Sequence, residues 1–295
     1  MSGGNEVVSH QSSVTIGHQT SVTSPVVITL VRAHNPGPYT GDGNNTYLLG
    51  GPEAVLIDAG SGEGRHCDEL EAALARHQAR LAAVLVTHGH SDHAAGVEGI
   101  AARWPTARFF KMPWPDHDAR YLVEWTRLAD GDRIAVGSDV IEAVHTPGHA
   151  PDHLAFWHER TRTVFAGDLV TEPGTVVIPA SHGGSLTQYL SSLRRVMTLR
   201  PARLLPAHGA AIDNPQAVLE RYFRHRARRE EQILAAVRSG CSTLESIVDN
   251  VYDGLLDELK GAARESVLAH LIKLEQEGAV TQDGERWGCV MSNEQ

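Results

Sequence analysis

The sequence predicts an α/β layered fold, followed by a small helical module that ends in a hairpin. In the first two thirds of the chain, short apolar runs alternate with stretches of helical spacing, which is the pattern of strands and helices packed in layers. Beyond residue 214, charged helical segments dominate. Histidines and aspartates gather directly after several predicted strands, which indicates where this fold would place a functional site.

Length, composition and charge restrict the class of protein. The chain has 295 residues, of which 41% are hydrophobic and 21% charged, as expected for a globular protein with one large or two unequal domains. No apolar run approaches the ~20 residues that a membrane helix needs, so no membrane partner is expected. The net charge of −10 argues against nucleic-acid binding by the chain as a whole.

The N-terminal residues and the cysteines indicate a cytoplasmic setting. Residues 1–24 lack a basic start, a continuous apolar core and arginine, so neither a secretory signal nor a transit peptide is expected; we predict a disordered tail. The three cysteines, Cys67, Cys241 and Cys289, are far apart and form neither a disulfide framework nor a Cys-x-x-Cys site. A reducing compartment fits this usage.

Short strands are predicted where apolar or alternating residues lie between clusters of turn formers. In chain order they lie at residues 26–31, 46–49, 54–57, 82–86, 133–136, 140–145, 154–158, 164–166 and 203–205. Helical spacing of apolar side chains predicts helices at 68–78, 96–104 and 187–199. The stretch 112–127, with two prolines and two tryptophans, is predicted to be irregular. It is either a cleft wall that recognises substrate or a capping loop packed by its own aromatic side chains.

The C-terminal part reads as a charged helix followed by a winged-helix layout. Five arginines lie within residues 219–231; a solvated helix face paired with Glu220, Glu230 and Glu231 is the expected structure, and a phosphate or carboxylate site is the alternative. Three helical segments follow from residue 241, the last at 262–277. A hairpin that turns at Asp283-Gly284 closes the chain.

The first ligand-type cluster follows the apolar run 82–86. Three histidines and one aspartate fall within six residues, where a strand ends and the chain must turn. Imidazole and carboxylate are preferred ligands of zinc and other borderline divalent metals. The candidate ligands are His88, His90, Asp92 and His93.

Three further ligand-type residues, His149, Asp168 and His208, also lie in loops after predicted strands. Seven ligands are too many for one tetrahedral zinc but suit two metals that share a carboxylate. The implied division gives one metal His88, His90 and His149, and the other Asp92, His93 and His208. Asp168 would bridge the two.

We therefore expect a cofactor of two divalent metal ions, zinc by preference, with Mn²⁺ or Fe²⁺ as alternatives. A hydroxide held between two such ions is a nucleophile at neutral pH, because coordination lowers the pKa of water toward ~7. Asp92 and Asp168 are the expected catalytic carboxylates. No Ser or Cys nucleophile is needed, and Cys67 receives no role.

The pattern His-x-His-x-Asp-His, followed by Thr146-Pro147-Gly148-His149, Gly167-Asp168 and His208-Gly209, resembles the metallo-β-lactamase superfamily. The resemblance covers roughly residues 26–213. It implies a four-layer αβ/βα sandwich with a dimetal site at one edge of its two sheets. Because Asp168 stands where one subclass of zinc β-lactamases carries Cys, the site is closer to that of hydroxyacylglutathione hydrolase and ribonuclease Z.

A narrower resemblance, to the β-lactamase-like protein 2 family, extends almost to the C-terminus. It rests on the motifs at residues 35–40, 45–48, 146–153, 225–230 and 268–278. That family includes a metal-dependent endoribonuclease selective for single strands, and bacterial relatives known mostly as hydrolases. Gly41 and Asn44 depart from its usual Leu and Thr, a departure expected to concern substrate contacts and not the metal site. The predicted division is a tail (1–24), a catalytic domain (25–214), a charged linker helix (215–240) and a winged-helix-like domain (241–295).

Three residues beside the ligands are candidates for support or substrate contact. Asp58 is expected to orient a ligand histidine, with a helix cap or turn residue as the alternative. His153 would either donate to substrate or support the ligands, and Asn45 belongs to the same group. His182 is expected in a surface loop. His117, His145 and His158 receive no functional assignment.

The C-terminal module carries 4 basic and 11 acidic side chains from residue 241 onward, a net charge of −7. Duplex DNA is therefore not an expected partner, because duplex binding needs phosphate neutralisation. Packing over the catalytic domain, narrowing of the cleft or self-association into a homo-oligomer is expected instead.

Three functions remain open. The first is hydrolysis of a small ester, thioester or lactone, with residues 112–127 contacting the acyl part. The second is cleavage of single-stranded RNA with the arginine helix near the backbone, and the third is a winged-helix binding protein with a vestigial metal domain. The intact ligand set argues against the third, and the acidity of the chain favours a small-molecule substrate over RNA.

Overall fold

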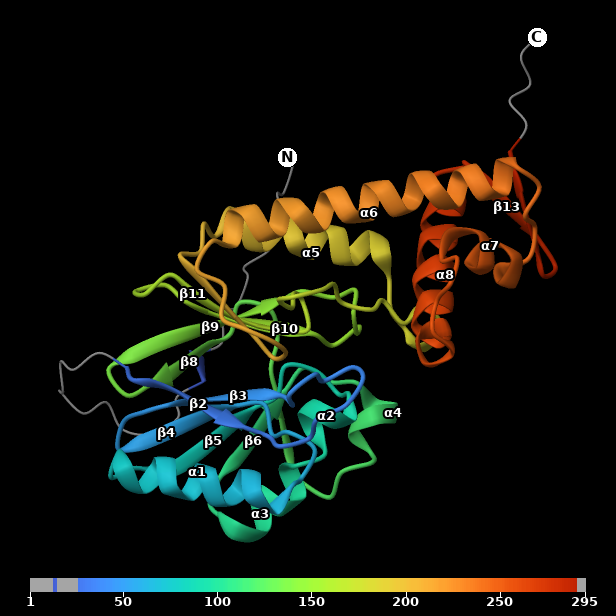
Figure 1. Ribbon diagram of the computed structural model, residues 1–295. Coiled ribbons are helices and arrows are strands. Elements are labelled where there is room, and N and C mark those ends of the chain that lie inside the picture. Colours follow the sequence, from blue (N-terminus) through green and yellow to red (C-terminus); the bar gives the residue numbers. More distant parts are fainter. Residues whose placement is uncertain (1–12, 15–25, 291–295) are drawn as a thin grey trace, which may run out of the picture.

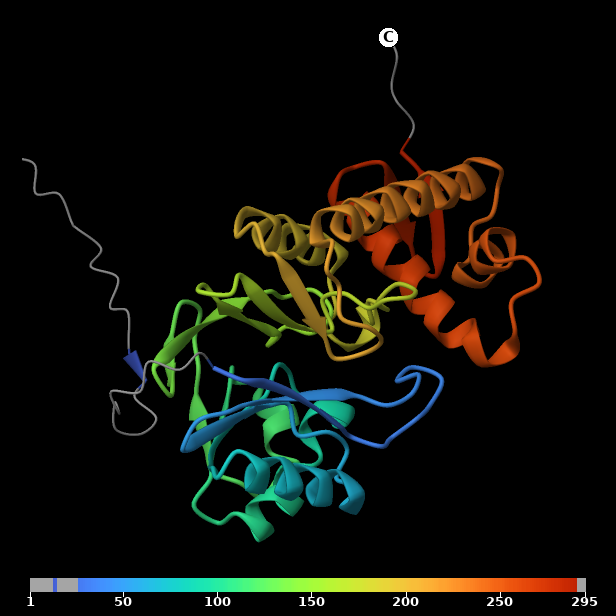
Figure 2. The same cartoon turned by 60° about the vertical axis from the view of Figure 1, so that its left-hand side comes forward.

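Two six-stranded sheets form the centre of the protein (Figures 1 and 2). The structure is a computed structural model that describes residues 13–14 and 26–290. The first sheet has the order β2 (Ile28–Arg32), β3 (Asn45–Leu49), β4 (Glu53–Ile57), β5 (Arg80–Leu85), β6 (Arg108–Lys111) and β7 (Trp125–Arg127). The second has the order β1 (Ser13–Val14), β8 (Arg133–Val136), β9 (Asp139–His145), β10 (Leu154–His158), β11 (Thr163–Gly167) and β12 (Arg203–Pro206).

The two sheets bury a common core, and helices cover their outer faces. Phe110 from the first sheet and Phe156 and Phe165 from the second lie in this core, each fully buried. Helices α1 (Gly64–Arg76) and α3 (Val97–Arg103) pack on the outside of the first sheet, and α5 (Leu186–Thr198) and α6 (Pro215–Arg238) on the outside of the second (Figure 1). This is the four-layer αβ/βα sandwich, so the predicted fold class is confirmed.

Strand direction explains how ligand loops can converge. Strands β4 to β7 run parallel to one another, and β11 runs parallel to β12, whereas the other described neighbours within β2–β4 and β8–β11 are antiparallel. The register of β11 against β12 shifts between Phe165 and Gly167, directly before Asp168. Such irregularities often redirect a side chain next to a functional site.

The C-terminal module shares helix α6 with the sandwich. Leu219 and Tyr222, in the first half of α6, pack in the core over the second sheet, whereas Ile233 and Val237 pack in the core of the module. That module contains α7 (Leu244–Val251), the 3₁₀ helix η2 (Asp257–Leu259), α8 (Lys260–Gln276) and the hairpin β13 (Val280–Asp283) and β14 (Arg286–Cys289). The predicted linker helix is therefore a packed element of two cores.

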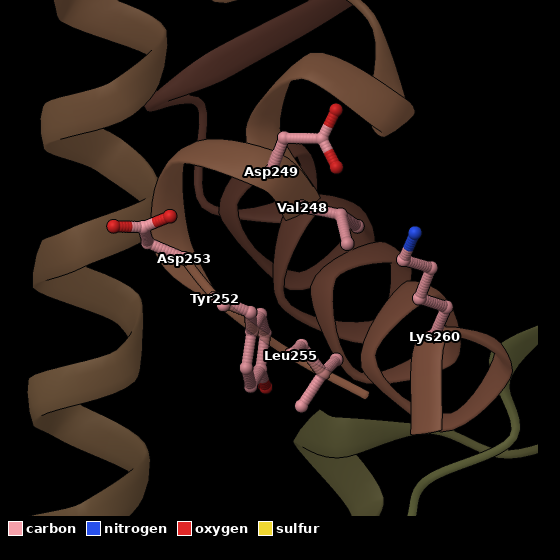
Figure 3. Close-up of a pocket in the computed structure, with 7 residues that line it drawn as sticks. Val248, Asp249, Tyr252, Asp253, Leu255 and Lys260 are labelled. Atoms are coloured by element: carbon pink, nitrogen blue, oxygen red, sulfur yellow. The ribbon is translucent and has the colours of Figure 1, made fainter. Parts of the chain in front are cut away.

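The module packs over the catalytic part through α8, as the sequence analysis expected. Ala269 of α8 belongs to the core over the second sheet, and Thr187 of α5 donates to Gln276 at 3.0 Å. A cavity of about 300 Å³ lies within the module, lined by residues of α7 and the segment up to Lys260 (Figure 3). None of its lining residues is a candidate ligand. Among the described residues, no helix is both long and apolar enough to cross a membrane.

Several elements differ from the predictions. Strands β6 and β7 were not predicted, and the stretch 112–127 contains β7 and the short helix α4 (Pro115–Asp118). The ligand stretch includes a helical turn, α2 (Ser91–Ala94), and the hairpin turns at Gly284-Glu285 because Asp283 pairs with Arg286 in the ladder. The predicted disordered tail lies outside the described residues, except for β1, which pairs with β8.

The arginine run on α6 was predicted as a solvated face, and this is wrong for Arg226. Its side chain is 3% exposed, donates to the Val176 carbonyl and lies over the Tyr189 ring at 5.3 Å. Arg224 pairs with Glu220 at 3.8 Å, as expected, whereas Arg221 pairs with Glu172 outside the helix. A sequence run of arginines does not distinguish these cases, since only the packing partner decides which one is buried.

Replacing Phe156 by Ala should lower the free energy of unfolding by about 3–5 kcal/mol, because the change leaves a cavity between the two sheets. Chemical unfolding of the full chain measures this loss. Val140→Ala, on the neighbouring strand β9 at a 37% exposed position, is the control and should cost no more than about 0.5 kcal/mol. Equal effects of the two changes would contradict the assignment of the inter-sheet core.

Candidate metal centre

Asp58 holds the ligand loop in place at the end of β4. Its carboxylate accepts from the Thr87 backbone N–H at 2.8 Å and from the Thr87 hydroxyl at 3.1 Å. The same side chain accepts from His93 Nδ1 at 2.9 Å. Because Nδ1 then carries the proton, His93 Nε2 is the nitrogen that can bind a metal. These contacts support the expected role of Asp58 in orienting a ligand histidine.

One group of candidate ligands consists of His88, His90 and His149. Their ligand atoms all lie within 4.8 Å of one another. His90 Nδ1 is 2.9 Å from His88 Nε2 and 2.9 Å from His149 Nε2. His149 Nδ1 lies 2.8 Å from the Val177 carbonyl, which can only accept, so His149 presents an unprotonated Nε2 to the group.

The second group consists of Asp92, His93 and His208, whose ligand atoms also lie within 4.8 Å of one another. Asp92 and His93 come from the turn α2, and His208 comes from the loop after β12. Asp92 Oδ2 is 3.3 Å from His208 Nε2 and 3.4 Å from His93 Nε2. These two groups have the residues predicted for separate metals, and a third group, His88, His93 and Asp168, spans them.

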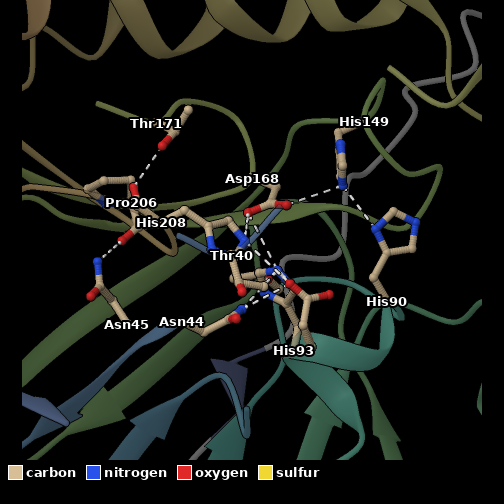
Figure 4. Close-up of polar contacts among 12 residues, drawn as sticks. Thr40, Asn44, Asn45, His90, His93, His149, Asp168, Thr171, Pro206 and His208 are labelled. Atoms are coloured by element: carbon tan, nitrogen blue, oxygen red, sulfur yellow. Dashed lines mark hydrogen bonds and ion pairs between the residues drawn. The ribbon is translucent and has the colours of Figure 1, made fainter. Parts of the chain in front are cut away.

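Asp168 lies between the two groups (Figure 4). Its Oδ1 is 3.1 Å from His208 Nε2 and 3.4 Å from His93 Nε2, and its Oδ2 is 3.3 Å from His149 Nε2. One carboxylate oxygen therefore faces each group, which is the arrangement that a bridging ligand needs.

The donor set fits two divalent cations. Asp168 Oδ1 is buried and has no hydrogen-bond partner, although two imidazole nitrogens lie within 3.4 Å of it. The short separations bring imidazole nitrogens and carboxylate oxygens, all of them able to bind a metal, close to a common point. A buried acceptor left in this state is costly unless a cation satisfies it.

His153 and Asn45 support ligands from behind. His153 is fully buried, accepts from the Asp168 backbone N–H at 3.0 Å and contacts the Thr146 hydroxyl at 2.8 Å through its other ring nitrogen. Asn45 donates to the Pro206 and Gly209 carbonyls at 2.9 Å each and so fixes the loop that carries His208. These contacts favour a supporting role for both residues over contact with substrate.

Glycines allow the ligand loops to approach closely. Gly167 has a φ of +49°, and a Cβ there would lie 2.6 Å from His153 Nε2. Gly148 has a φ of +134°, and a Cβ there would lie 2.3 Å from the Tyr189 backbone nitrogen. A larger residue would clash with the His153 ring at position 167 and with the Tyr189 backbone at position 148.

Burial and the carboxylates set the protonation of the histidines. Burial, reinforced by the neighbouring His149, lowers the pKa of His90 to about 3, so His90 is neutral and available as a ligand. Burial alone would also lower the pKa of His208, but the carboxylates of Asp168 and Asp92 outweigh it and raise that pKa to about 9. The same opposition raises the pKa of His93, beside Asp92, Asp168 and Asp58.

Asn44 contacts a candidate ligand, and sequence reasoning missed this contact. Its side-chain amide is fully buried and donates to Asp92 Oδ2 at 3.1 Å. Asn35 locks it through two hydrogen bonds, of 2.8 and 2.9 Å. The departure at Asn44, expected to concern substrate contacts, thus also reaches a candidate ligand. The departure itself was the available signal, because an amide reaches further than a hydroxyl.

An aromatic pair lies beside the first group. Trp114 and His117 stack with ring centroids 3.5 Å apart, and the Trp114 ring lies 6.0 Å from that of His90. Both side chains are half-buried. His117, to which the sequence analysis gave no role, therefore belongs to a wall of the site, whereas His145 and His158 make contacts with Pro151 and Thr161 outside it. His182 ends the exposed 3₁₀ helix η1 (Ala180–His182).

Two protein-family models match parts of the chain. The model for the metallo-beta-lactamase superfamily matches residues 39–208, and the model for the beta-lactamase associated winged helix domain matches residues 243–287. A Caenorhabditis elegans protein named beta-lactamase-like protein 2 homolog is 30% identical over 257 residues, which cover 86% of this chain and 85% of that protein. An Aspergillus fumigatus protein named atrochrysone carboxyl ACP thioesterase is 33% identical over 225 residues, which cover 75% of this chain and 68% of that protein.

Solved structures give the same fold. A beta-lactamase domain protein from Burkholderia ambifaria superposes with a TM-score of 0.77, covering 89% of this chain and 91% of that one. Its sequence identity is 23%, so this likeness concerns the fold alone.

Metal binding should strengthen as the pH rises from ~6.5 toward about 9, because His208 must lose a proton before its Nε2 can coordinate. The sign follows from the raised pKa: charged His208 stabilises the metal-free protein below ~6.5, and this contribution is lost as the pH rises through about 9. Calorimetric zinc titration at pH 6.5, 7.5 and 8.5, in buffers of different ionisation enthalpy, measures both affinity and proton release. Affinity that does not change with pH, with no proton released, would contradict this account.

Proposed function

The chain belongs to the metallo-β-lactamase superfamily of hydrolases, and from this premise we propose that it hydrolyses a small thioester, ester or lactone at a dinuclear metal centre. Its resemblance to the β-lactamase-like protein 2 family is confirmed by the 30% identity over most of both chains. The single observation that carries the dinuclear proposal is the position of Asp168, with one carboxylate oxygen toward each group of ligands.

The seven proposed ligands are His88, His90, Asp92, His93, His149, Asp168 and His208. When bound, two divalent ions, zinc by preference, would supply an activated water at neutral pH and polarise the carbonyl under attack. The chain's own residues would fix where this happens. Asp168 sets the spacing of the two groups, and Asp92, with 27% of its side chain exposed, faces the open side of the centre.

Support from Asp58, Asn44, Asn45 and His153 keeps the ligands in place before substrate arrives. Asp58 and Asn44 hydrogen-bond to ligand side chains, His153 to the backbone of a ligand, and Asn45 to the loop that carries one. All four are almost fully buried. A site whose ligands are already oriented does not reorganise during the reaction, which is a general source of rate enhancement.

Three observations support an acyl substrate. A relative named as an acyl-carrier-protein thioesterase is 33% identical over 225 residues. The Trp114–His117 stack provides an apolar surface beside His90 against which the acyl part of a substrate can pack. The acidic chain, with a net charge of −10, does not attract a long polyanion.

Single-stranded RNA is the alternative substrate. The arginines of α6 are the residues that the sequence suggests for contact with its phosphates. Arg221 and Arg224 are paired with Glu172 and Glu220, and Arg226 is buried. Paired or buried guanidinium groups contribute little to phosphate binding, so this alternative has weaker support. The third hypothesis, a binding protein that uses its winged helix, is disfavoured because α8 packs on the catalytic part.

Metal analysis of the purified chain should find two divalent ions per chain, and Asp168→Ala should reduce this content and lower hydrolysis by at least about 100-fold. Asp249→Ala, an exposed carboxylate beside the module's cavity (Figure 3), is the matched control and should retain both. Full turnover by Asp168→Ala would contradict its proposed bridging role.

A parallel assay on acyl thioesters, lactones and single-stranded RNA should find turnover on the acyl panel. Trp114→Ala should raise KM for substrates with large acyl groups more than for acetyl thioesters, because the larger group loses its packing surface. RNA cleavage that exceeds acyl turnover, and that is lost on replacing Arg221, Arg224 and Arg228, would establish the nuclease alternative instead.

A further inference from the structure

The segment that follows Asp168 contacts both a ligand of the metal centre and helix α8 of the C-terminal module. We name residues 168–185 the bridging segment; it begins at the central carboxylate and ends at the start of α5. Two of its backbone groups contact the turn that carries His149. The Val177 carbonyl accepts from His149 Nδ1 at 2.8 Å, and the Ser185 N–H donates to the Gly148 carbonyl at 2.8 Å.

Helix α6 holds the bridging segment from outside. Arg226 donates to the Val176 carbonyl, one residue before the carbonyl that contacts His149. The Tyr222 hydroxyl accepts from the Thr171 N–H at 2.8 Å and lies 2.9 Å from the Thr171 carbonyl. Thr171 in turn donates from its hydroxyl to the His208 carbonyl at 3.0 Å. Two ligand loops are thus reached from one helix through the same segment.

Arg226 is unusual because its guanidinium is buried without a carboxylate partner in the part of the chain that the structure describes. It lies over the ring of Tyr189, whose hydroxyl donates to the Leu169 carbonyl at 2.8 Å. Burying a charged group is expensive unless it is well hydrogen-bonded, and a residue kept in this state is rarely a passive filler. The carbonyl of Val176 is the partner that this burial provides.

Helix α8 of the winged-helix module makes the second attachment. Glu265 accepts from the Ser181 N–H at 2.9 Å and from the Ser181 hydroxyl at 2.6 Å. Helix α8 is itself joined to α6 by Lys273, which lies 2.9 Å from Glu230. Residues 176–181 are therefore held at one end by α6 and at the other by α8.

We propose that the C-terminal module is a positioning element for the metal centre: Arg226 and Glu265 hold residues 176–181 so that the Val177 carbonyl fixes the ring of His149. This inference rests on the proposed metal site and extends it to residues in another part of the chain. The C-terminal module would then support the metal centre of its own chain. Helix α8 would pack on the catalytic part of that chain.

The physical reason is that a ligand imidazole needs a fixed partner on its other nitrogen. Loss of such a partner typically costs about 10–100-fold in metal affinity. Loss of the hold on Val177 should therefore lower the metal affinity of the group formed by His88, His90 and His149. The metal affinity of the group formed by Asp92, His93 and His208 should stay nearly unchanged. A role in packing alone would lower thermal stability without this selectivity.

Cobalt(II) titration of the metal-free full chain, followed by visible absorption, resolves the two binding steps. His149→Ala identifies the step that belongs to the first group. Arg226→Met should weaken that step by about 10-fold, and Arg226→Lys should restore part of the loss because an ammonium can still donate to the Val176 carbonyl. Arg228→Met, an exposed position on the same helix, is the matched control.

Glu265→Ala keeps the test decisive if Arg226→Met does not fold, because Glu265 is only half-buried. This change should weaken the same cobalt-binding step by about 3-fold. The effect is smaller because Glu265 holds Ser181, which lies four residues after Val177. Glu245→Ala, which removes an exposed ion pair with Arg264 inside the module, is its control and should change neither step.

Unchanged affinities in both Arg226→Met and Glu265→Ala would overturn the proposal, and so would an equal loss in both binding steps. A wild-type chain that binds no cobalt would instead overturn the proposed metal centre itself. The two failures are therefore distinguishable, and neither depends on knowing the substrate.

Discussion

The structure depends on one carboxylate, that of Asp168, being held between two groups of imidazoles. Each of its oxygens faces a different group, and the backbone that delivers it comes from an irregular end of β11. His153 holds the Asp168 N–H, and Tyr189 holds the next carbonyl, that of Leu169. A charge buried in this way is stable only if its surroundings compensate it, which explains why so many supporting hydrogen bonds converge on this loop.

A feature of the fold or of the candidate site could be predicted from sequence where it depends on side-chain type, and not where it depends on the backbone or on tertiary contacts. The seven ligand-type residues were predictable, because each follows an apolar run and their side chains have a restricted chemistry. The Val177 carbonyl was not, since a backbone acceptor leaves no mark on residue type. Strands β6 and β7 were not predicted, because their sequences are short and end in a charged residue, as loops often do. They are Arg108–Lys111 and Trp125–Arg127. Asn44 could be flagged as unusual, but its contact with Asp92 depends on a fold that joins residues 48 positions apart.

The arginine helix illustrates the same limit. Five arginines in thirteen residues look like a solvated face, and for Arg224 that interpretation is correct. Arg226 lies on the buried side with Leu219 and Tyr222, where its guanidinium meets a carbonyl and an aromatic ring. Helical spacing alone places Tyr222 and Arg226 four residues apart on one face, so the periodicity held the information. The general preference of arginine for solvent suggested an exposed side chain. Tertiary packing instead buries Arg226.

Charge and packing together favour a small substrate over a nucleic acid. A nuclease gains affinity from exposed cations along the path of the phosphates. Of the arginines of α6, two are neutralised by glutamates, Arg226 is used internally and Arg228 stays exposed. The module beyond them has a net charge of −7. What lies beside the ligands is instead a stacked tryptophan and histidine, which can bury an apolar group but cannot neutralise a phosphate. One of these ion pairs also contacts the loop that carries His208. Arg221 holds Glu172, and the Glu172 carbonyl accepts from Ala210, two residues after His208. Arg221 therefore supports a ligand loop and is at the same time neutralised by Glu172, which leaves less positive charge on α6 for a polyanion.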